Sequence, residues 1–368
     1  MRVQVLGVRR SILCATALAM LWPAGLLRAE DGDSVRQQAF LPSPVRSVST
    51  IPANGDVNPY GVAFVPPQFP AGGTIHPGDI LISNFNNSNN LQGTGTTITT
   101  VPASASTSLF FQGQAGLGLS TALAVLDEGL VLVGNFPTTD GSCATAQAGS
   151  LLVLDSKGNL LSTLDKTATI DGPWDMTVSE RGGGNVQIFI TNALSGTVAR
   201  LDAKATASGL TVQKETQIAS GYMHRCDPTA LVVAPTGLVY DAFRDVLYVA
   251  STEDNAVFAL HHAGRTDHDL GTGSVIYRDD RHLHGPNAMA LAPNGDLLAS
   301  QSDAINPDAN QPSEIVEFTT SGRFVKEISM DPQQGAAFGL AVEAGGRTAR
   351  LAAVDDAANT LVIWTLPR

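Results

Sequence analysis

The sequence has few cysteines, little charge and no long apolar run after its first 29 residues. Three cysteines in 368 residues cannot build the dense disulfide framework of a small secreted domain, so stability must come from a buried core. Charged residues make up 15% and aromatic residues 6%, while 36 glycines and 20 prolines indicate a turn-rich chain. No run between residue 30 and the end is long and apolar enough to cross a bilayer.

Motifs that carry common chemistries are absent as well. The sequence holds no Gly-x-Ser-x-Gly, no phosphate-binding glycine loop and no Cys-x-x-Cys. A nucleophile elbow, a nucleotide-phosphate loop and a thioredoxin-like redox pair are therefore not expected.

The first 29 residues differ from the rest. Arg2, Arg9 and Arg10 precede an apolar stretch from Ile12 to Leu27, and the small residue Ala29 stands at a cleavage position. This pattern predicts a secretory signal peptide over residues 1–29 and export to a periplasm or the cell exterior. A twin-arginine signal, which Arg9-Arg10 loosely resembles, and a retained membrane anchor are the alternatives.

The charge balance indicates which partners to expect. The signal segment holds four of the 22 basic residues and none of the 34 acids, so its removal changes the net charge from −12 to −16. An acidic surface repels phosphate backbones and anionic lipid headgroups, so nucleic acid and membrane surfaces are not expected partners. The expected partner is a small molecule or another protein.

Two cysteines, Cys143 and Cys226, lie outside the signal segment. In an oxidising compartment an isolated pair predicts a disulfide bond. Two separate buried thiols are the alternative.

One short pattern recurs six times, a small or polar residue followed by alternating apolar residues. The copies are Pro59–Phe64, Ser120–Val125, Pro173–Val178, Pro228–Val233, Pro286–Leu291 and Ala337–Val342. Their third residues, 61, 122, 175, 230, 288 and 339, are 51 to 61 residues apart. Each copy is followed by a turn and two further apolar runs, and in several copies a glycine turn leads to a fourth. Four short strands per unit without a helical period are typical of a propeller blade.

The sixth copy ends after its third run, which leaves its outer edge open. The segment Val45 to Ile51 has strand character and can supply the missing strand. The sequence therefore predicts an all-β fold over residues 40–368, a six-bladed β-propeller whose ring is closed by an N-terminal strand completing the last blade.

The segments Pro59–Phe64 and Asn287–Pro293, with the runs Ile80–Asn84 and Val246–Ser251, resemble NHL repeats. Gluconolactonase-like and paraoxonase-like enzymes have similar blades, so the resemblance specifies the fold better than the activity. It implies a six-bladed ring with a central channel and a ligand at the channel mouth, where the inner strands begin.

Polar residues at the ends of the second runs and the starts of the first are predicted to surround this mouth as ligand-binding residues. They are Asn84, Asn135, Asn192, Asp175, Asn287 and Asp355. Their amide and carboxylate oxygens could hold Ca²⁺. The alternative is that such residues cap turns.

A gluconolactonase-like enzyme is expected to carry a glutamate at the start of its first blade. This sequence has Asn58-Pro59-Tyr60-Gly61 there, although Asp175 and Asn287 could stand where later ligands stand. The missing glutamate counts against a hydrolase.

Two histidines, His224 and His284, precede the fourth and fifth copies and are predicted to enter the mouth from adjacent blades. They could be zinc ligands, or a general base acting with Asp227. Solvent-facing loop histidines are the alternative. The predicted disulfide would fold the loop 136–149 partly over the channel as a lid.

Three functions remain open at this point. The first is an exported binding or scaffold protein with a polar channel mouth. The others are a metal-dependent hydrolase or lactonase of the gluconolactonase-like group, and a lyase or oxidoreductase that uses the His224 and His284 region.

Overall fold

The computed structural model describes residues 41, 46–102, 106–165 and 167–367. The predicted signal peptide, residues 1–29, lies outside the described residues. Among the described residues no helix has the length and apolar character needed to cross a membrane.

The chain forms six four-stranded antiparallel sheets. Blade 1 contains β2 (Val57–Phe64), β3 (Ile80–Asn86), β4 (Thr97–Val101) and β5 (Ser108–Gln112). Blade 2 contains β6 (Leu119–Val125), β7 (Val131–Asn135), β8 (Ser150–Leu154) and β9 (Leu160–Leu164). Blade 3 contains β10 (Pro173–Glu180), β11 (Asn185–Asn192), β12 (Thr197–Thr206) and β13 (Gly209–Ala219).

Blade 4 contains β16 (Pro235–Asp241), β17 (Val246–Ser251), β18 (Ala256–His261) and β19 (Ser274–Tyr277). Blade 5 contains β20 (Pro286–Leu291), β21 (Leu297–Gln301), β22 (Glu314–Phe318) and β23 (Phe324–Ser329). Blade 6 contains β24 (Ala337–Gly345), β25 (Thr348–Asp355), β26 (Thr360–Pro367) and, on its outside, β1 (Arg46–Ser49).

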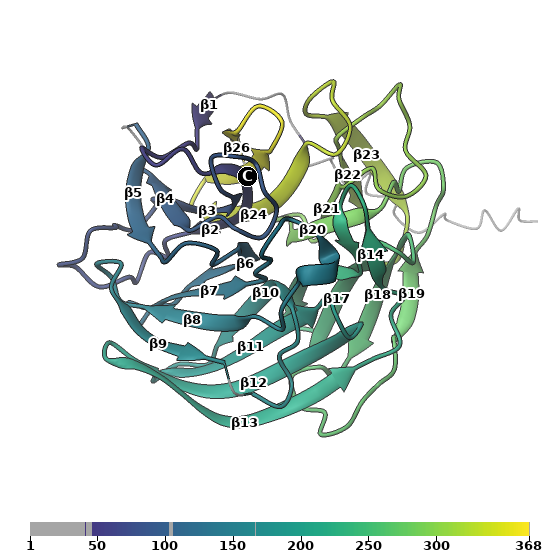
Figure 1. Cartoon of the computed structure of the whole chain (residues 1–368). Coiled ribbons are helices and arrows are strands. Elements are labelled where there is room, and N and C mark those ends of the chain that lie inside the picture. The colour runs from purple at the N-terminus through teal and green to yellow at the C-terminus, as the bar shows by residue number, and fades with distance from the viewer. Residues whose placement is uncertain (1–40, 42–45, 103–105, 166, 368) are drawn as a thin grey trace, which may run out of the picture. The chain divides into compact units, whose positions relative to one another are not determined.

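The six inner strands form a closed ring. Each contacts the next in the order β2, β6, β10, β16, β20, β24, and β24 contacts β2 again. Together they surround a cavity of about 260 Å³ at the centre. Figure 1 shows the sheets arranged around this centre, from purple blade 1 to yellow blade 6. The predicted six-bladed propeller is confirmed.

Apolar side chains that alternate along the strands form the core between adjacent blades. Leu81 and Ile98 of blade 1 share one buried cluster with Leu123, Val133 and Leu152 of blade 2. Burying a side chain of this size contributes about 1.5–3 kcal/mol. Packing between blades, repeated around the ring, therefore provides the core that the scarcity of cysteine requires.

The N-terminal strand completes blade 6, as predicted. β1 pairs antiparallel with β26, from Arg46 opposite Ile363 to Ser49 opposite Thr360. Val48 packs against the apolar cluster between blades 6 and 1. The first and last strands of the described chain thus lie in one sheet.

The predicted inner strand of blade 4 is wrong by seven residues. Pro228–Val233 was expected there, but Leu231–Val233 is β15, which pairs with β14 (Arg225–Asp227) in a separate two-stranded ribbon. The inner strand is β16, which repeats the same pattern and has glycine at its third position. A Cβ atom at Gly237 would lie 2.2 Å from the carbonyl oxygen of Asn287 in blade 5, so only glycine fits there.

The predicted disulfide between Cys143 and Cys226 is present, with the two Cα atoms 5.6 Å apart. Cys143 begins η1 (Cys143–Thr145), a short 3₁₀ turn in the β7–β8 loop. Cys226 lies in β14. The bond therefore attaches the β14–β15 ribbon to a loop of blade 2.

We predict that Val48→Asp lowers the free energy of unfolding by about 1–3 kcal/mol, because it places a charge against an apolar cluster. Ser47→Asp is the matched control, since Ser47 is exposed on the same strand. Urea unfolding followed by circular dichroism measures both. Equal stabilities for the two variants would show that β1 does not hold the ring closed.

We also predict that reducing the disulfide lowers the free energy of unfolding by about 2–5 kcal/mol, because the bond closes a long loop in the unfolded chain. Its cysteines are 83 residues apart. Urea unfolding with and without a thiol reductant measures the effect. A Cys143→Ser/Cys226→Ser double variant should be as unstable as the reduced protein and should not respond to reductant.

Candidate functional site

Five aromatic side chains meet at the end of the ring where the inner strands begin, and we call them the aromatic plug. Tyr60 stacks on Phe85 and on Phe338, with ring centroids 4.6 and 4.0 Å apart. Trp174 meets Phe85 and Phe136 edge-on, each at 5.6 Å. These residues come from blades 1, 2, 3 and 6, so the plug spans the axis of the ring.

The β14–β15 ribbon covers the plug. Leu231, Val232 and Ala234 belong to the same buried cluster, and Cys143 packs against it. Leu231 has a φ of 64°, a conformation that is costly for a branched side chain. The disulfide thus holds the ribbon and the β7–β8 loop over this end, which agrees with the predicted lid.

The predicted ligand-binding asparagines connect strands within their own blades. Asn84 donates to Thr97 at 3.1 Å and Asn192 donates to Thr197 at 3.0 Å. Asn135 accepts a hydrogen bond from Ser150 at 2.7 Å. We call the position where the second strand ends and the third begins the blade corner. In blades 1, 2 and 3 this corner is an amide paired with a hydroxyl.

The remaining members of the predicted set also have backbone partners or are buried. Asp355 accepts a hydrogen bond from the backbone of Ala358. Asn287 is buried at the start of β20, and its side-chain nitrogen has no partner in the described part of the chain. A role for the six residues in ligand binding stays a prediction.

The channel residues do not fit the metal site that the gluconolactonase-like resemblance implies. One carboxylate oxygen of Asp175 accepts from the backbone of Met176 at 2.8 Å, and the other accepts from that of Leu238 at 3.1 Å. Burial raises the pKa of Asp175 to about 7. With Asn58 where a glutamate is expected and both Asp175 oxygens engaged, too few anionic ligands remain.

The two predicted histidines have separate partners. His224 is exposed, and its ring lies 3.1 Å from the carbonyl of Tyr222. Asp227 accepts hydrogen bonds from Arg225 and from its own turn. His284 is buried in a different group of side chains, described below. Among the described residues, no contact joins the two histidines.

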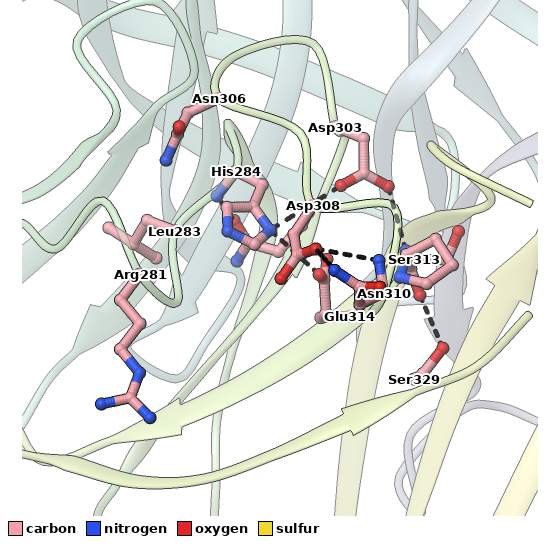
Figure 2. A network of polar contacts seen from close by, with 12 residues as sticks. Arg281, Leu283, His284, Asp303, Asn306, Asp308, Asn310, Ser313, Glu314 and Ser329 are labelled. Carbon is pink, nitrogen blue, oxygen red and sulfur yellow. Dashed lines mark hydrogen bonds and ion pairs between the residues drawn. The ribbon is translucent and has the colours of Figure 1, made fainter. Parts of the chain in front are cut away.

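His284 belongs to a buried group with Asp303 and Glu314, which we call the His284 cluster (Figure 2). Nδ1 of His284 is 2.9 Å from Glu314 Oε1 and 3.9 Å from Asp303 Oδ1. The three side chains are 3%, 2% and 0% exposed for His284, Asp303 and Glu314. Burial, reinforced by the charge of Asp303, raises the pKa of Glu314 to about 8.

Sequence reasoning found His284 but missed both carboxylates. Asp303 follows β21 in a long loop, where an acid is unremarkable in sequence. Glu314, however, opens the apolar run of β22, and a charged residue at a buried strand position is itself a signal.

A second polar site lies between blades 1 and 6, and we call it the amide pocket. It is a cavity of about 430 Å³ at the start of β2, beside the β3–β4 and β25–β26 loops. Its polar lining residues are Asn58, Asn86, Ser88, Asn90, Gln92, Gln333, Asp356 and Asn359. The sequence patterns selected none of these residues for ligand binding.

Two amide oxygens of residues that line the amide pocket have no hydrogen-bond donor in the described part of the chain. Asn86 Nδ2 donates to Asn90 Oδ1 at 2.7 Å, but Asn86 Oδ1 and Gln92 Oε1 are buried and have no partner among the described residues. The backbone of Asn58 donates to Asn359 Oδ1 at 2.7 Å, which joins the two blades. Burial, with the charge of Asp355, raises the pKa of Asp356 well above its usual range.

No protein family and no curated protein matches the chain. Among solved structures it is similar to a gluconolactonase of Xanthomonas campestris, at 14% identity over 88% of this chain and 89% of that one, with a TM-score of 0.57. It is also similar to an α-L-arabinanase of Penicillium chrysogenum complexed with arabinobiose (12%, 89% and 99%, 0.54). A virginiamycin B lyase of Staphylococcus aureus is a third (15%, 88% and 88%, 0.50). At these identities the likeness shows a shared propeller fold, in agreement with the resemblance to gluconolactonase-like blades.

Proposed function

We propose that the protein is a binding protein that holds a neutral, hydroxyl-rich small molecule, such as a sugar or polyol, in the amide pocket. The observation that carries the proposal is the pair of buried amide oxygens, of Asn86 and Gln92, without hydrogen-bond donors beside a cavity of about 430 Å³. Leaving such acceptors unpaired costs about 1–3 kcal/mol each, and rotation of either amide toward the cavity would let a hydroxyl donor of the ligand recover it.

The lining chemistry matches hydroxyl groups better than charged ones. An amide offers a carbonyl acceptor and two N–H donors, and a hydroxyl group both donates and accepts. The pocket has no lysine or arginine among its lining residues, and its single acid is Asp356. The raised pKa of Asp356 favours the protonated carboxyl, which can donate as well as accept. A phosphate or carboxylate ligand would have no cation to pair with.

Hydrogen bonds tie the loops of the pocket to neighbouring elements, which lowers the ordering cost of binding. Asn58 stands at the start of β2, and its backbone N–H donates to Asn359 Oδ1 in the β25–β26 loop at 2.7 Å. Gln92 Nε2 donates to the carbonyl of Thr229 at 2.7 Å, next to the β14–β15 ribbon. The disulfide therefore supports the pocket through the ribbon.

Binding is favoured over catalysis because of the groups present. The lining contains no histidine, cysteine or lysine, so a nucleophile with an adjacent base is not available from these residues. The hydrolase alternative needs the channel site, where Asp175 is already engaged by two backbone amides. The third alternative needs His224 and His284 together, and they have separate partners.

Export is part of the proposal and is supported by the disulfide, which forms stably in oxidising compartments. The expectation is that protein recovered from a periplasmic or culture-medium fraction begins at Glu30. N-terminal sequencing by mass spectrometry measures this. Recovery in the cytoplasm with Met1 retained would contradict it.

We predict that Gln333→Ala weakens the binding of the best sugar or polyol in a panel about threefold to tenfold, because one hydrogen bond to the ligand is lost. Gln334→Ala is the matched control, since Gln334 is the exposed neighbour outside the pocket lining. Isothermal titration calorimetry measures both. A panel without any binder, or equal loss in both variants, would reject the amide pocket as the site.

A further inference from the structure

We propose that the His284 cluster is a binding site for one divalent transition-metal ion, with Zn²⁺ the expected ion. The ligands are Nδ1 of His284 and one oxygen each from Asp303 and Glu314. The site lies within blade 5, where His284 precedes β20, Asp303 follows β21 and Glu314 begins β22. None of its three ligands lines the amide pocket, although the loop that supplies Gln333 to that pocket also bonds Ser313 and Asp303.

The spacing of the three groups suits a single ion. The ligand atoms all lie within 4.8 Å of one another. Ligands around a tetrahedral zinc ion at about 2.0–2.1 Å are roughly 3.4 Å apart. The distances from His284 Nδ1, 2.9 Å to Glu314 and 3.9 Å to Asp303, bracket that value. Small side-chain movements would therefore complete the geometry.

Each carboxylate of the cluster has one buried oxygen without a hydrogen-bond partner in the described chain. Asp303 Oδ1 and Glu314 Oε2 are buried and unpaired among the described residues. Asp303 Oδ2, in contrast, accepts from the backbone of Ser313 at 2.9 Å and from that of Gly335 at 2.7 Å. These two bonds fix the carboxylate and leave Oδ1 free. Buried oxygens that lack donors are what a cation requires.

The charge of the cluster also favours a cation. Two carboxylates meet one imidazole, and His284 is the only basic group within ion-pair distance of either carboxylate in the described chain. Figure 2 shows Arg281 with its guanidinium directed away from the cluster. A dication bound between them would balance the charge of both carboxylates in their ionised form.

Comparison with blades 1, 2 and 3 shows that this corner departs from the amide–hydroxyl pair that those blades share. Glu314 is aligned with Thr97, Ser150 and Thr197, which begin the third strands of blades 1, 2 and 3 and bond the amide opposite. In blade 5 Gln301 keeps the amide, and it accepts from the backbone N–H of His284 at 2.8 Å. Turn stabilisation needs only the amide and a hydroxyl, so the imidazole and the second carboxylate require another explanation.

Three non-glycine residues of the loop between β21 and β22 have left-handed backbone conformations. Asp303, Asn306 and Ser313 have φ values of 53°, 51° and 56°, a region that non-glycine residues enter at a cost. Such conformations concentrate where a structure positions functional groups. Gln301 holds the backbone of His284, and this loop holds the two carboxylates. The ligands are therefore positioned before the ion binds.

The ligand set identifies the class of ion. One nitrogen and two carboxylate oxygens leave a fourth position for water, as zinc sites with three protein ligands do. Ca²⁺ takes six to eight oxygen ligands, more than the cluster offers. Asp308 lies on the outer part of the loop, where its charge acts on both Glu314 and His284 and attracts a cation (Figure 2).

The test uses the purified full chain, treated with a chelator, dialysed and titrated with ZnCl₂, MnCl₂ and CaCl₂. Isothermal titration calorimetry and elemental analysis by mass spectrometry give affinity and stoichiometry. We expect one equivalent of Zn²⁺ per chain and an increase in Tm when it binds. Glu314→Gln should weaken Zn²⁺ binding on the order of 100-fold. Glu317→Gln should bind like the wild type, since Glu317 is a buried glutamate on the same strand outside the cluster.

Several outcomes would overturn the proposal. One is no stoichiometric binding of Zn²⁺ or Mn²⁺, which would leave a purely structural ion pair between His284 and Glu314. Another is equal affinity in Glu314→Gln and the wild type. A preference for Ca²⁺ would reject the class of ion. If Glu314→Gln does not fold, Asp303→Asn and His284→Gln provide the same comparison. Sugar binding in the amide pocket should persist after chelation, because none of the three metal ligands lines that pocket, so failure of one proposal is distinguished from failure of the other.

Discussion

The close approach of six inner strands around one axis is the constraint on which the rest of the structure depends. A Cβ atom at Gly339 would lie 1.9 Å from the carbonyl oxygen of Tyr60, and one at Gly61 would lie 2.8 Å from that of Thr121. These contacts join blade 6 to blade 1 and blade 1 to blade 2, and neither admits a side chain. Because β24 must meet β2, the two ends of the propeller come together, and β1 pairs with β26. The same meeting places the β25–β26 loop beside the start of β2, which creates the amide pocket.

Unpaired buried polar atoms are informative in this ring only where they converge. The nitrogen of the Trp364 indole also lacks a partner among the described residues, but it is buried in an apolar cluster. Asn86 and Gln92 differ because both line one cavity, and Asp303 and Glu314 differ because both face one imidazole. A single orphaned atom costs stability and implies nothing further, whereas several directed at one point indicate a missing partner.

Much of the fold could be predicted because the strands of each blade are neighbours in the sequence. The four-strand period, the strand that completes blade 6 and the disulfide all follow from short patterns and from counting. Blade 4 was misplaced because Pro228 and Pro235 both begin a segment with the expected alternation. The deciding feature is Gly237, whose need for glycine depends on the neighbouring strand and not on the segment itself. Long-range contact between blades is invisible to a pattern read along the chain.

The candidate sites were less predictable for a related reason. The asparagines at strand ends were the most regular polar signal in the sequence, and they stabilise the corners of blades 1, 2 and 3. His284 could be selected because histidine is rare. Its partners are less visible in the sequence, because Asp303 lies in the β21–β22 loop and Glu314 begins β22.

In a repeat protein the positions that break the pattern carry more information than those that keep it, because the repeat itself already explains the latter. Gln301 keeps the corner amide, while the hydroxyl of blades 1, 2 and 3 is replaced by Glu314 and an imidazole is added. Blade 5 thus retains the amide that blades 1, 2 and 3 use and adds two groups that those blades lack. The amide pocket arises in a comparable way, at the junction where blade 6 must be completed by the other end of the chain. In this propeller, chemistry is expected where the symmetry of the ring is broken.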